Sequence, residues 1–261
     1  MAIVGGPPDQ RRRPEFTTPA VAILSDIHAN RQALDAVLRS MRGARVTEWW
    51  CVGDLVDYGA DPVYCARACL SGASRCLAGN HDLAATGRID FSAFSEWVHA
   101  AASWTGEVLG PGLRAEIAAL PPAEPDHKVP MFHASPRDPV WEYVVSDEVA
   151  RASLNLVDAR LTLVGHSHIP AAWHLAPDGT LSGGFVSGEA TVELTEGKWI
   201  VNPGSVGQPR DGDARAAWAI LDLEGGELRF RRTPYDVAGA QNAILAAGLP
   251  TSLADRLSYG R

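Results

Sequence analysis

The sequence lacks the long apolar runs and the basic excess that mark two large classes of protein. No stretch approaches the ~20 apolar residues that a membrane-spanning helix needs, so no association with a membrane is expected. Acidic residues outnumber basic ones and the formal net charge is −8, which argues against non-specific binding to nucleic acid. A small anionic substrate is compatible with this charge, because a bound metal can supply a local positive field.

Cysteine is also scarce, and all of it lies in one quarter of the chain. The four residues are Cys51, Cys65, Cys69 and Cys76. A disulfide framework would be spread over a smaller, secreted chain, so we expect buried free thiols in a cytoplasmic protein. Cys65 and Cys69 are four apart on a predicted helix and could hold a metal, but the sequence offers no second ligand pair near them.

The length and segment composition indicate one domain with a short leader. Residues 1–19 are rich in proline, glycine and arginine and lack an apolar signal-peptide core, which predicts a disordered lead-in. Residues 20–261 are long enough for one large core and contain no repeat or low-complexity segment. They predict a single domain, with a homo-oligomer left open.

Strand-like and helix-like runs alternate over the first part of this domain. Apolar runs at 20–25, 49–53 and 74–78 predict buried strands. Amphipathic spacing at 31–42 and 62–71 predicts helices between them. Alternation of this kind predicts an α/β sheet with helices packed outside it.

The rest of the chain predicts a helical insertion and then a second group of strands. Residues 83–127 have helical spacing, broken at Gly110-Pro111, and contain no strand candidate, which predicts a small helical cap. The other expected elements are strands at 129–132 and 161–164, a helix at 146–157, short strands within 171–196, strands at 198–201, 217–222 and 228–232, and helices within 236–261.

Five loops at the ends of strand-like runs carry side chains that can bind metals. The stretch Gly79-Asn80-His81-Asp82 is typical of a loop aimed at charge, because it places an amide, an imidazole and a carboxylate side by side. The potential ligands in the five loops are Asp26, His28, Asp54, Asn80, His133, His166 and His168. This mixture of oxygen and nitrogen donors suits Mn²⁺, Fe or Zn²⁺ better than Ca²⁺ or Mg²⁺.

A surface or core role would explain any one of these histidines, but not their grouping. Five of the 8 histidines fall in four short loops, each accompanied by Asp, Asn or Gly. His99, His127 and His174 lie outside these loops and have no predicted role.

In this order the motifs resemble the five-part pattern of the calcineurin-like metallophosphoesterases. The parts are Asp26-x-His28, Gly53-Asp54-x-x-Asp57, Gly79-Asn80-His81-Asp82, His133 and Gly165-His166-x-His168. Residues 202–210 resemble the closing loop of the small bacterial and archaeal branch, which includes phosphodiesterases and relatives of diadenosine tetraphosphatase. The resemblance spans about residues 20–222 and implies a central β-sandwich of two mixed sheets flanked by helices.

The resemblance also implies two metal ions that share a bridging carboxylate. Asp54 would be the bridge, and a hydroxide held between the ions would attack phosphorus in line. The ligands would be Asp26, His28, Asp54 and His168 for one ion and Asp54, Asn80, His133 and His166 for the other. His81 would not be a ligand but would give a proton to the leaving oxygen, with Asp57 behind it to orient the ring.

Two positions depart from the protein Ser/Thr phosphatases of this family. Tyr58 stands where those enzymes carry an arginine that grips the phosphate, and Asp82 stands where they carry Glu. Both departures argue against a protein phosphatase. Arg137 or Arg210 would then be a substitute clamp or, alternatively, part of an ordinary surface ion pair.

Three further residues are candidates for the substrate pocket. Asn30 follows the first metal-binding motif and is a candidate for substrate binding. Trp141 and Tyr143 would wall the pocket or, as aromatic residues more often do, serve in packing.

The leading hypothesis is a binuclear metal-dependent phosphoesterase acting on small or nucleotide-like substrates of the phosphodiester or dinucleoside polyphosphate type. The alternatives are a phosphomonoesterase, protein phosphatases included, and a non-catalytic scaffold that binds proteins. Scaffolds of this kind are expected to have lost ligands, whereas all seven ligand positions are filled here.

Overall fold

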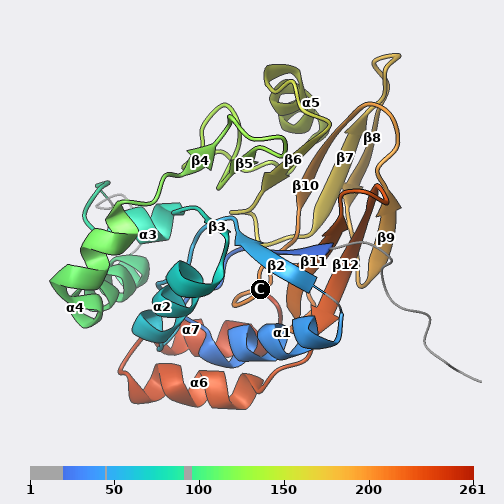
Figure 1. Ribbon diagram of the computed structural model, residues 1–261. Helices are drawn as coiled ribbons and strands as arrows, with labels where there is room; N and C mark the ends of the chain where they lie inside the picture. Colours follow the sequence, from blue (N-terminus) through green and yellow to red (C-terminus); the bar gives the residue numbers. More distant parts are fainter. Residues whose placement is uncertain (1–19, 45, 91–95) are drawn as a thin grey trace, which may run out of the picture.

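The protein is a sandwich of two sheets with helices on both outer faces (Figure 1). The computed structural model describes residues 20–44, 46–90 and 96–261. The predicted two-sheet sandwich with flanking helices is therefore confirmed, while the predicted lead-in at 1–19 lies outside the described residues. Among the described residues, no helix combines the length and the apolar character needed to cross a membrane.

The first sheet combines a parallel half with an antiparallel half. Its strands are β1 (Ala20–Leu24), β2 (Val46–Cys51), β3 (Arg75–Cys76), β9 (Ala190–Glu193), β11 (Ala216–Asp222) and β12 (Glu227–Thr233). They lie in the order β3-β2-β1-β11-β12-β9. The strands β1, β2 and β3 run parallel, as expected of strands joined through helices, and the other pairings are antiparallel.

The second sheet repeats this mixture and contains a strand that the sequence did not reveal. Its strands are β4 (Ala123–Glu124), β5 (Met131–Phe132), β6 (Leu161–Val164), β7 (Ala171–Leu175), β8 (Leu181–Phe185) and β10 (Lys198–Asn202), in the order β4-β5-β6-β10-β7-β8. The expectation of no strand within 83–127 is wrong at β4. This two-residue strand has no apolar pattern and is defined by its pairing with β5.

The helices divide between the two outer faces of the sandwich. They are α1 (Arg31–Gly43), α2 (Pro62–Gly72), α3 (Asn80–Ala85), α4 (Glu96–Ala118), α5 (Asp147–Leu156), α6 (Val237–Ala246), α7 (Thr251–Asp255) and the 3₁₀ turn η1 (Arg256–Ser258). Helix α1 packs on the first sheet and α5 on the second, while α6 and α7 lie beside α1 (Figure 1). The helices therefore leave one edge of the sandwich to loops.

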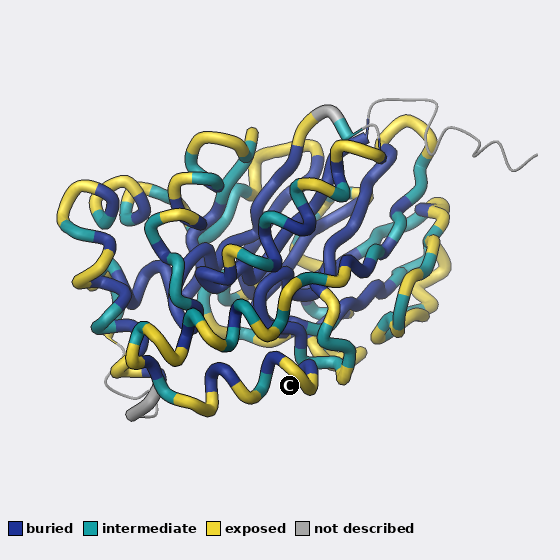
Figure 2. Tube along the Cα trace, turned by 90° about the horizontal axis from the view of Figure 1, so that it is seen from below, coloured by how far each residue is buried: buried dark blue, intermediate teal, exposed yellow. Residues whose placement is uncertain are grey.

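Strand β1 shows how one strand serves two layers of the core. Ala20, Ala22 and Leu24 face the cluster formed with α1 and α2, whereas Val21 and Ile23 face the second sheet. This alternation follows from the two-residue period of a strand, and both faces are apolar because both are covered. Strands β1, β6 and β11 are buried along their whole length, and Figure 2 shows the buried segments in dark blue at the centre of the molecule.

The stretch at 79–82 begins a helix, contrary to the prediction of a loop. Helix α3 starts at Asn80, and the Asp82 carboxylate in its first turn accepts a hydrogen bond from Gly79 N–H at 2.9 Å. The same carboxylate also accepts from Leu55 N–H at 3.0 Å and Val56 N–H at 3.1 Å. Asp82 thus caps α3 and ties it to the loop after β2.

The helix predicted within residues 83–127 is present, with its predicted break. Gly110 inside α4 has φ 66° and ψ 168°, which interrupts the helix at the expected place. Helix α4 packs against α2 and α3. The expected helical positions Phe91 and Phe94 lie outside the described residues.

Candidate metal centre

The loops that carry the predicted ligands meet because the strands before them are parallel. Strands β1, β2 and β3 end at one edge of the first sheet, and β5, β6 and β10 end at the neighbouring edge of the second. Hydrogen bonds join the loops, for example Asp26 N–H to the Gly53 carbonyl at 3.0 Å and Gly207 N–H to the Asp26 carbonyl at 3.0 Å. The carboxyl ends of parallel strands are a common place for ligand sites.

The backbone of these loops is strained. The described residues other than glycine that have positive φ angles all lie here, and they are Asp26, His28, Ala29, Asp54, Asp57, Tyr58, His166 and His168. Each such conformation costs on the order of 1–3 kcal/mol and persists only where the surroundings enforce it. Strain gathered at one edge of the molecule is typical of a functional site.

The structure brings the predicted ligands into two groups that share one carboxylate. Asp26, His28, Asp54 and His168 form one group, and Asp54, His133 and His166 form the other, with the donor atoms of each group within 4.8 Å of one another. Asn80 Oδ1 adds an oxygen to the second group, because it lies 3.2 Å from His133 Nε2. All these side chains are buried. Among the described residues, no cysteine joins such a group.

Main-chain carbonyls fix the orientation of three of the histidines. A carbonyl can only accept a hydrogen bond, so the ring nitrogen facing it carries the proton and the other nitrogen keeps its lone pair. The three contacts join His28 Nδ1 to the Val56 carbonyl (3.2 Å), His133 Nδ1 to the Val52 carbonyl (2.9 Å) and His168 Nδ1 to the Gln208 carbonyl (2.7 Å). In each ring Nε2 therefore faces the centre as an acceptor, as metal-binding histidines require.

Several acceptor atoms in the centre face each other without a hydrogen-bond donor. Asp26 Oδ1, Asp54 Oδ2 and His166 Nε2 are buried and have no hydrogen-bond partner. Asp54 Oδ2 lies 3.5 Å from His28 Nε2 and 3.4 Å from His133 Nε2. Buried acceptors packed against each other are unfavourable unless a positive charge lies between them. A proton on a histidine or a bound metal ion can supply this charge, and the donor set fits metal cations.

The pKa values of the histidines agree with this interpretation. Burial lowers the pKa of His28 and His168 well below the ordinary value, and it lowers that of His166 to about 3, so all three are neutral near pH 7. Burial also acts on His133, but the Asp54 carboxylate outweighs it and raises the pKa to about 9. In the absence of a cation, His133 thus holds a proton against Asp54, and a metal would displace it.

Two glycines allow the loops to approach so closely. A Cβ atom on Gly79 would lie 2.0 Å from Asp54 Oδ1, and one on Gly53 would lie 2.6 Å from His133 Nδ1. Gly53 also has a φ of +105°, which disfavours any side chain. The buried His/Asp groups and the glycines between them are consistent with a binuclear metal site.

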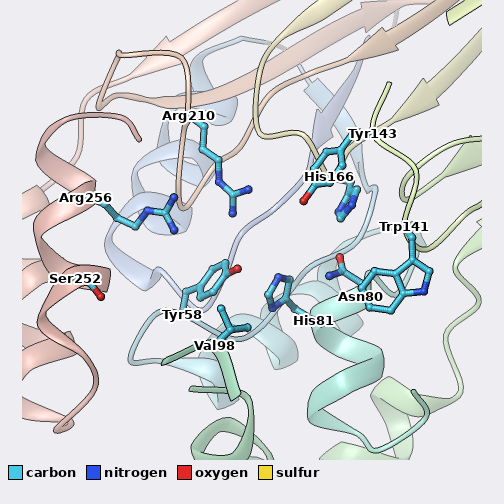
Figure 3. A pocket seen from close by; sticks show the side chains of 10 residues that line it. All are labelled: Tyr58, Asn80, His81, Val98, Trp141, Tyr143, His166, Arg210, Ser252 and Arg256. Carbon is cyan, nitrogen blue, oxygen red and sulfur yellow. The ribbon is translucent and has the colours of Figure 1, made fainter. Parts of the chain in front are cut away.

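His81 stands beside the metal centre and points into the space in front of it (Figure 3). Its Nδ1 lies 2.7 Å from Oδ2 of the fully buried Asp57. Burial opposes a charge on the ring, but the Asp54 and Asp57 carboxylates together raise the pKa of His81 above its ordinary value. The Tyr58 ring packs against both His81 and His28, at centroid distances of 4.5 and 4.6 Å.

A cavity of about 690 Å³ opens above the metal centre (Figure 3). Asn80, His81 and His166 form its floor. Its walls include Tyr58, Val98, Trp141, Tyr143, Arg210, Ser252 and Arg256. The Tyr143 ring stacks on His166 at 4.0 Å, so the aromatic pair foreseen as a pocket wall lines the cavity, as does Arg210. The volume lies within the range of small-molecule sites.

Two other substrate candidates have different surroundings. Arg137 forms an ion pair with Glu142, with 2.9 Å between Nε and Oε2, which is the surface-pair alternative. Asn30 caps α1, because its Oδ1 accepts from Ala33 N–H at 3.0 Å, and its Nδ2 donates to the Gly207 carbonyl at 2.8 Å. Neither is among the residues that line the cavity.

Three residues in the cavity wall had no signal in the sequence. Val98 comes from α4, Ser252 from α7 and Arg256 from η1. None stands at a strand end or within a motif, and the sequence does not distinguish Arg256 from an ordinary surface arginine. Only the packing of α4, α7 and η1 beside the site reveals them.

Comparisons with known proteins agree with this geometry. The calcineurin-like phosphoesterase superfamily domain matches residues 20–226. An uncharacterized protein of Methanocaldococcus jannaschii is 34% identical over 252 residues, an alignment that covers 92% of this chain and 98% of the relative. The chain therefore belongs to the calcineurin-like phosphoesterase superfamily, and the predicted family is confirmed.

Two solved structures share the whole architecture. A metallophosphoesterase from Sphaerobacter thermophilus has 34% sequence identity and a TM-score of 0.84, with 94% of this chain and 100% of that chain covered. A hypothetical protein from Pyrococcus horikoshii has 19% identity and a TM-score of 0.76, with 94% and 99% covered, and it shows the fold alone. The protein is thus a metal-dependent phosphoesterase whose His/Asp groups are buried at one edge of the sandwich.

Proposed function

We propose that this protein uses two metal ions to hydrolyse phosphodiesters of small or nucleotide-like compounds, dinucleoside polyphosphates included. One observation carries the proposal: carbonyls aim three buried histidines at carboxylate oxygens that have no hydrogen-bond donor while the rings are neutral. A purely structural cluster would have paired these acceptors with donors. The mixed nitrogen and oxygen donors favour Mn, Fe or Zn.

The two groups of side chains divide the ligands between two ions. Asp54 would bridge them, because its Oδ1 accepts from His81 N–H at 3.0 Å while its Oδ2 faces histidines of both groups. The proposed ligands are Asp26, His28, Asp54 and His168 for the first ion and Asp54, Asn80, His133 and His166 for the second. When bound, such ions activate water and neutralise the charge on the phosphoryl oxygens.

His81 is the proposed general acid. Asp57 accepts from the Nδ1 side of the ring, so the Nε2 side faces the cavity and can donate a proton to the departing oxygen. The neighbouring carboxylates favour the imidazolium form that this role needs. Tyr58 packs against the ring and limits its rotation.

The shape of the cavity favours a diester over a monoester. Walls rise on two sides of the floor, with Trp141 and Tyr143 on one side and Arg210 and Arg256 on the other (Figure 3). Both ester groups of a diester would therefore contact a wall of the cavity. Tyr58 gives the second motif an aromatic ring in place of a bidentate phosphate clamp.

Metal content and turnover test this function together. Purified protein is loaded with Mn²⁺, its metal is counted by mass spectrometry, and bis(p-nitrophenyl) phosphate is compared with p-nitrophenyl phosphate. We expect two equivalents of metal and faster hydrolysis of the diester. Faster hydrolysis of the monoester would favour a phosphomonoesterase, and two equivalents of metal without hydrolysis across a broad phosphate panel would favour a scaffold.

We propose the cytoplasm as the compartment of this activity. All four cysteines are free, and Cys51, Cys65 and Cys69 are buried, which suits a reducing environment. Thiol titration of protein taken directly from cells, under denaturing conditions, checks this. Four reactive thiols are expected, and a disulfide would argue against it.

A further inference from the structure

We infer that Arg210 and Arg256 form a subsite for a second anionic group, so that the preferred substrates carry a further phosphate beside the one that is cleaved. The inference rests on the proposed function, because it places the cleaved phosphate at the metal centre. Arg256 would then be a specificity-determining residue contributed by the C-terminal segment.

The two arginines reach the same hollow from separate parts of the chain. Arg210 lies in the loop between β10 and β11, and Arg256 begins η1. Figure 3 shows both guanidinium groups pointing into the cavity from the side opposite Trp141. Arg256 Nε donates to the main-chain oxygen of Arg261 at 2.5 Å, and Arg210 Nη2 donates to Gln208 Oε1 at 3.0 Å, so both side chains are held in place.

The Asp26 carboxylate acts on Arg210 electrostatically, but no carboxylate of the described residues lies within ion-pair distance of it. Within residues 20–44, 46–90 and 96–261, the Nε of Arg210 is buried without a hydrogen-bond partner. Burial lowers the pKa of Arg256, and the positive charge of Arg210 lowers it further, as expected of two cations that line one cavity. Two arginines held close together in a cavity are suited to a phosphate, whose oxygens accept several charge-assisted hydrogen bonds.

The charge expected in the loaded site exceeds what a simple diester can balance. Two divalent ions against the carboxylates of Asp26 and Asp54 and a hydroxide between them would leave one positive charge, while protonated His81 and Asp57 cancel. Arg210 adds a second positive charge, and Arg256, whose Nε contacts the Arg261 oxygen, lies on the same side of the cavity. The single negative charge of a phosphodiester leaves part of this excess in place, whereas an additional phosphate neutralises the arginine side of the cavity.

The opposite side of the cavity suits a different chemical group. Trp141 and Tyr143 have exposed fractions of 40% and 45% and present aromatic surface there. A substrate that crosses the floor would thus place its reacting phosphate over His81 and Asn80, a second phosphate toward the arginines and a flat apolar group toward the aromatic wall. A nucleotide with two separate phosphates has this combination.

A pair of chromogenic substrates that differ in one phosphate tests the subsite. They are the p-nitrophenyl ester of thymidine 5′-phosphate and the same compound with a 3′-phosphate. We expect kcat/KM to be about 10- to 100-fold higher for the second compound, the range expected for a hydrogen bond to a charged group. Arg256→Gln should bring this ratio close to one, and Arg256→Lys should restore part of it, because lysine keeps the charge.

The matched control is Arg39→Gln, which removes the same charge from an exposed position on α1 and should preserve the ratio. Calorimetry supplies a readout without turnover, as thymidine 3′,5′-bisphosphate should bind more tightly than thymidine 5′-monophosphate to the wild type and not to Arg256→Gln. Equal ratios in wild type and Arg256→Gln, or no preference in the wild type, would overturn the subsite.

The same measurements separate the subsite from the proposed function. Hydrolysis of both compounds at equal rates would refute the subsite and leave the phosphodiesterase intact. Tighter binding of the bisphosphate without hydrolysis of either compound would keep the subsite and refute the phosphodiesterase. If Arg256→Gln fails to fold, the wild-type preference and the Arg256→Lys variant still decide the question.

Discussion

The floor and the walls of the cavity are built in different ways. The floor and the metal centre beneath it come from loops that directly follow parallel strands, and carbonyls and strained backbone fix their side chains. Most of the walls come from α4, α7, η1 and the exposed loop that carries Trp141 and Tyr143, and the loops after β2 and β10 add Tyr58 and Arg210. The sandwich therefore fixes the chemistry, whereas elements outside it shape what enters.

The largest effect is expected at the bridging carboxylate of the floor. Asp54→Asn keeps the shape of the side chain but removes the charge that both groups of ligands share. We expect both metal ions to be lost and turnover to fall by about 10³-fold or more. Metal analysis together with a turnover assay checks this, with Glu107→Gln on exposed α4 surface as the control. Retention of two equivalents would show that Asp54 is no bridge.

The next largest effect is expected at the general acid. His81→Ala should keep both metal ions and lower kcat by about 10²- to 10⁴-fold, because the leaving oxygen no longer receives a proton. A series of aryl esters checks this, since good leaving groups need the proton least and should lose least. An equal loss across the series would exclude an acid role for His81.

A glycine substitution tests how tightly the floor is packed. The new methyl of Gly79→Ala would lie 2.0 Å from Asp54 Oδ1, so α3 and the loop after β2 must move apart. We expect a loss of about 1–3 kcal/mol in the free energy of unfolding, measured in urea, together with weaker metal retention. Gly112→Ala in α4 is the matched control, because no atom lies within 4 Å of the methyl that this change adds. Equal stability of the two variants would count against close packing.

The pH dependence of activity tests His81, which lies at the edge of the cavity floor. The pKa of His81 is raised, so its proton is present below that pKa and is lost as the pH rises through it. Activity should therefore decline on the alkaline side. Asp57→Asn removes a carboxylate that contributes to the shift, so the alkaline decline of kcat should move to lower pH. If the dependence of kcat on pH is unchanged, another group controls the decline at alkaline pH.

The smallest effect is expected outside the cavity. Arg137 pairs with Glu142 at the surface and does not line the cavity, so Arg137→Gln should keep turnover within about twofold. Steady-state kinetics on the same diester checks this. A large rise in KM would show that Arg137 contacts the substrate, although it does not line the cavity.

Much of the floor was predictable from the sequence, because apolar runs indicate where strands end and the Asp, Asn and His residues that follow them are common metal ligands. His166 and His168 follow an apolar run, and the run became β6. The helix at Asn80 was missed although Asp82, three residues after Gly79, caps it locally. The further bond of Asp82 to the loop after β2 is a contact that no local pattern encodes. Strand β4 was missed because two residues carry no periodicity.

The walls were predictable only in part. Trp141, Tyr143 and Arg210 were candidates because aromatic or basic residues stood near the motifs. Arg256 was not, since its place in the cavity depends on how α6 and α7 pack beside α1. A helix face indicates that a segment is buried, but not which distant loop it will meet.

The loops with positive φ angles carry the proposed metal ligands, so the melting temperature should report how much metal is bound. Their conformations are held by cross-loop hydrogen bonds, and ions shared by the same loops would add a clamp that only the folded chain possesses. Any ligand that binds only the native state raises its stability in proportion to the logarithm of the ligand concentration. A fluorescence melt in a series of Mn²⁺, Fe²⁺ and Zn²⁺ concentrations would therefore rank the metals without any substrate in hand.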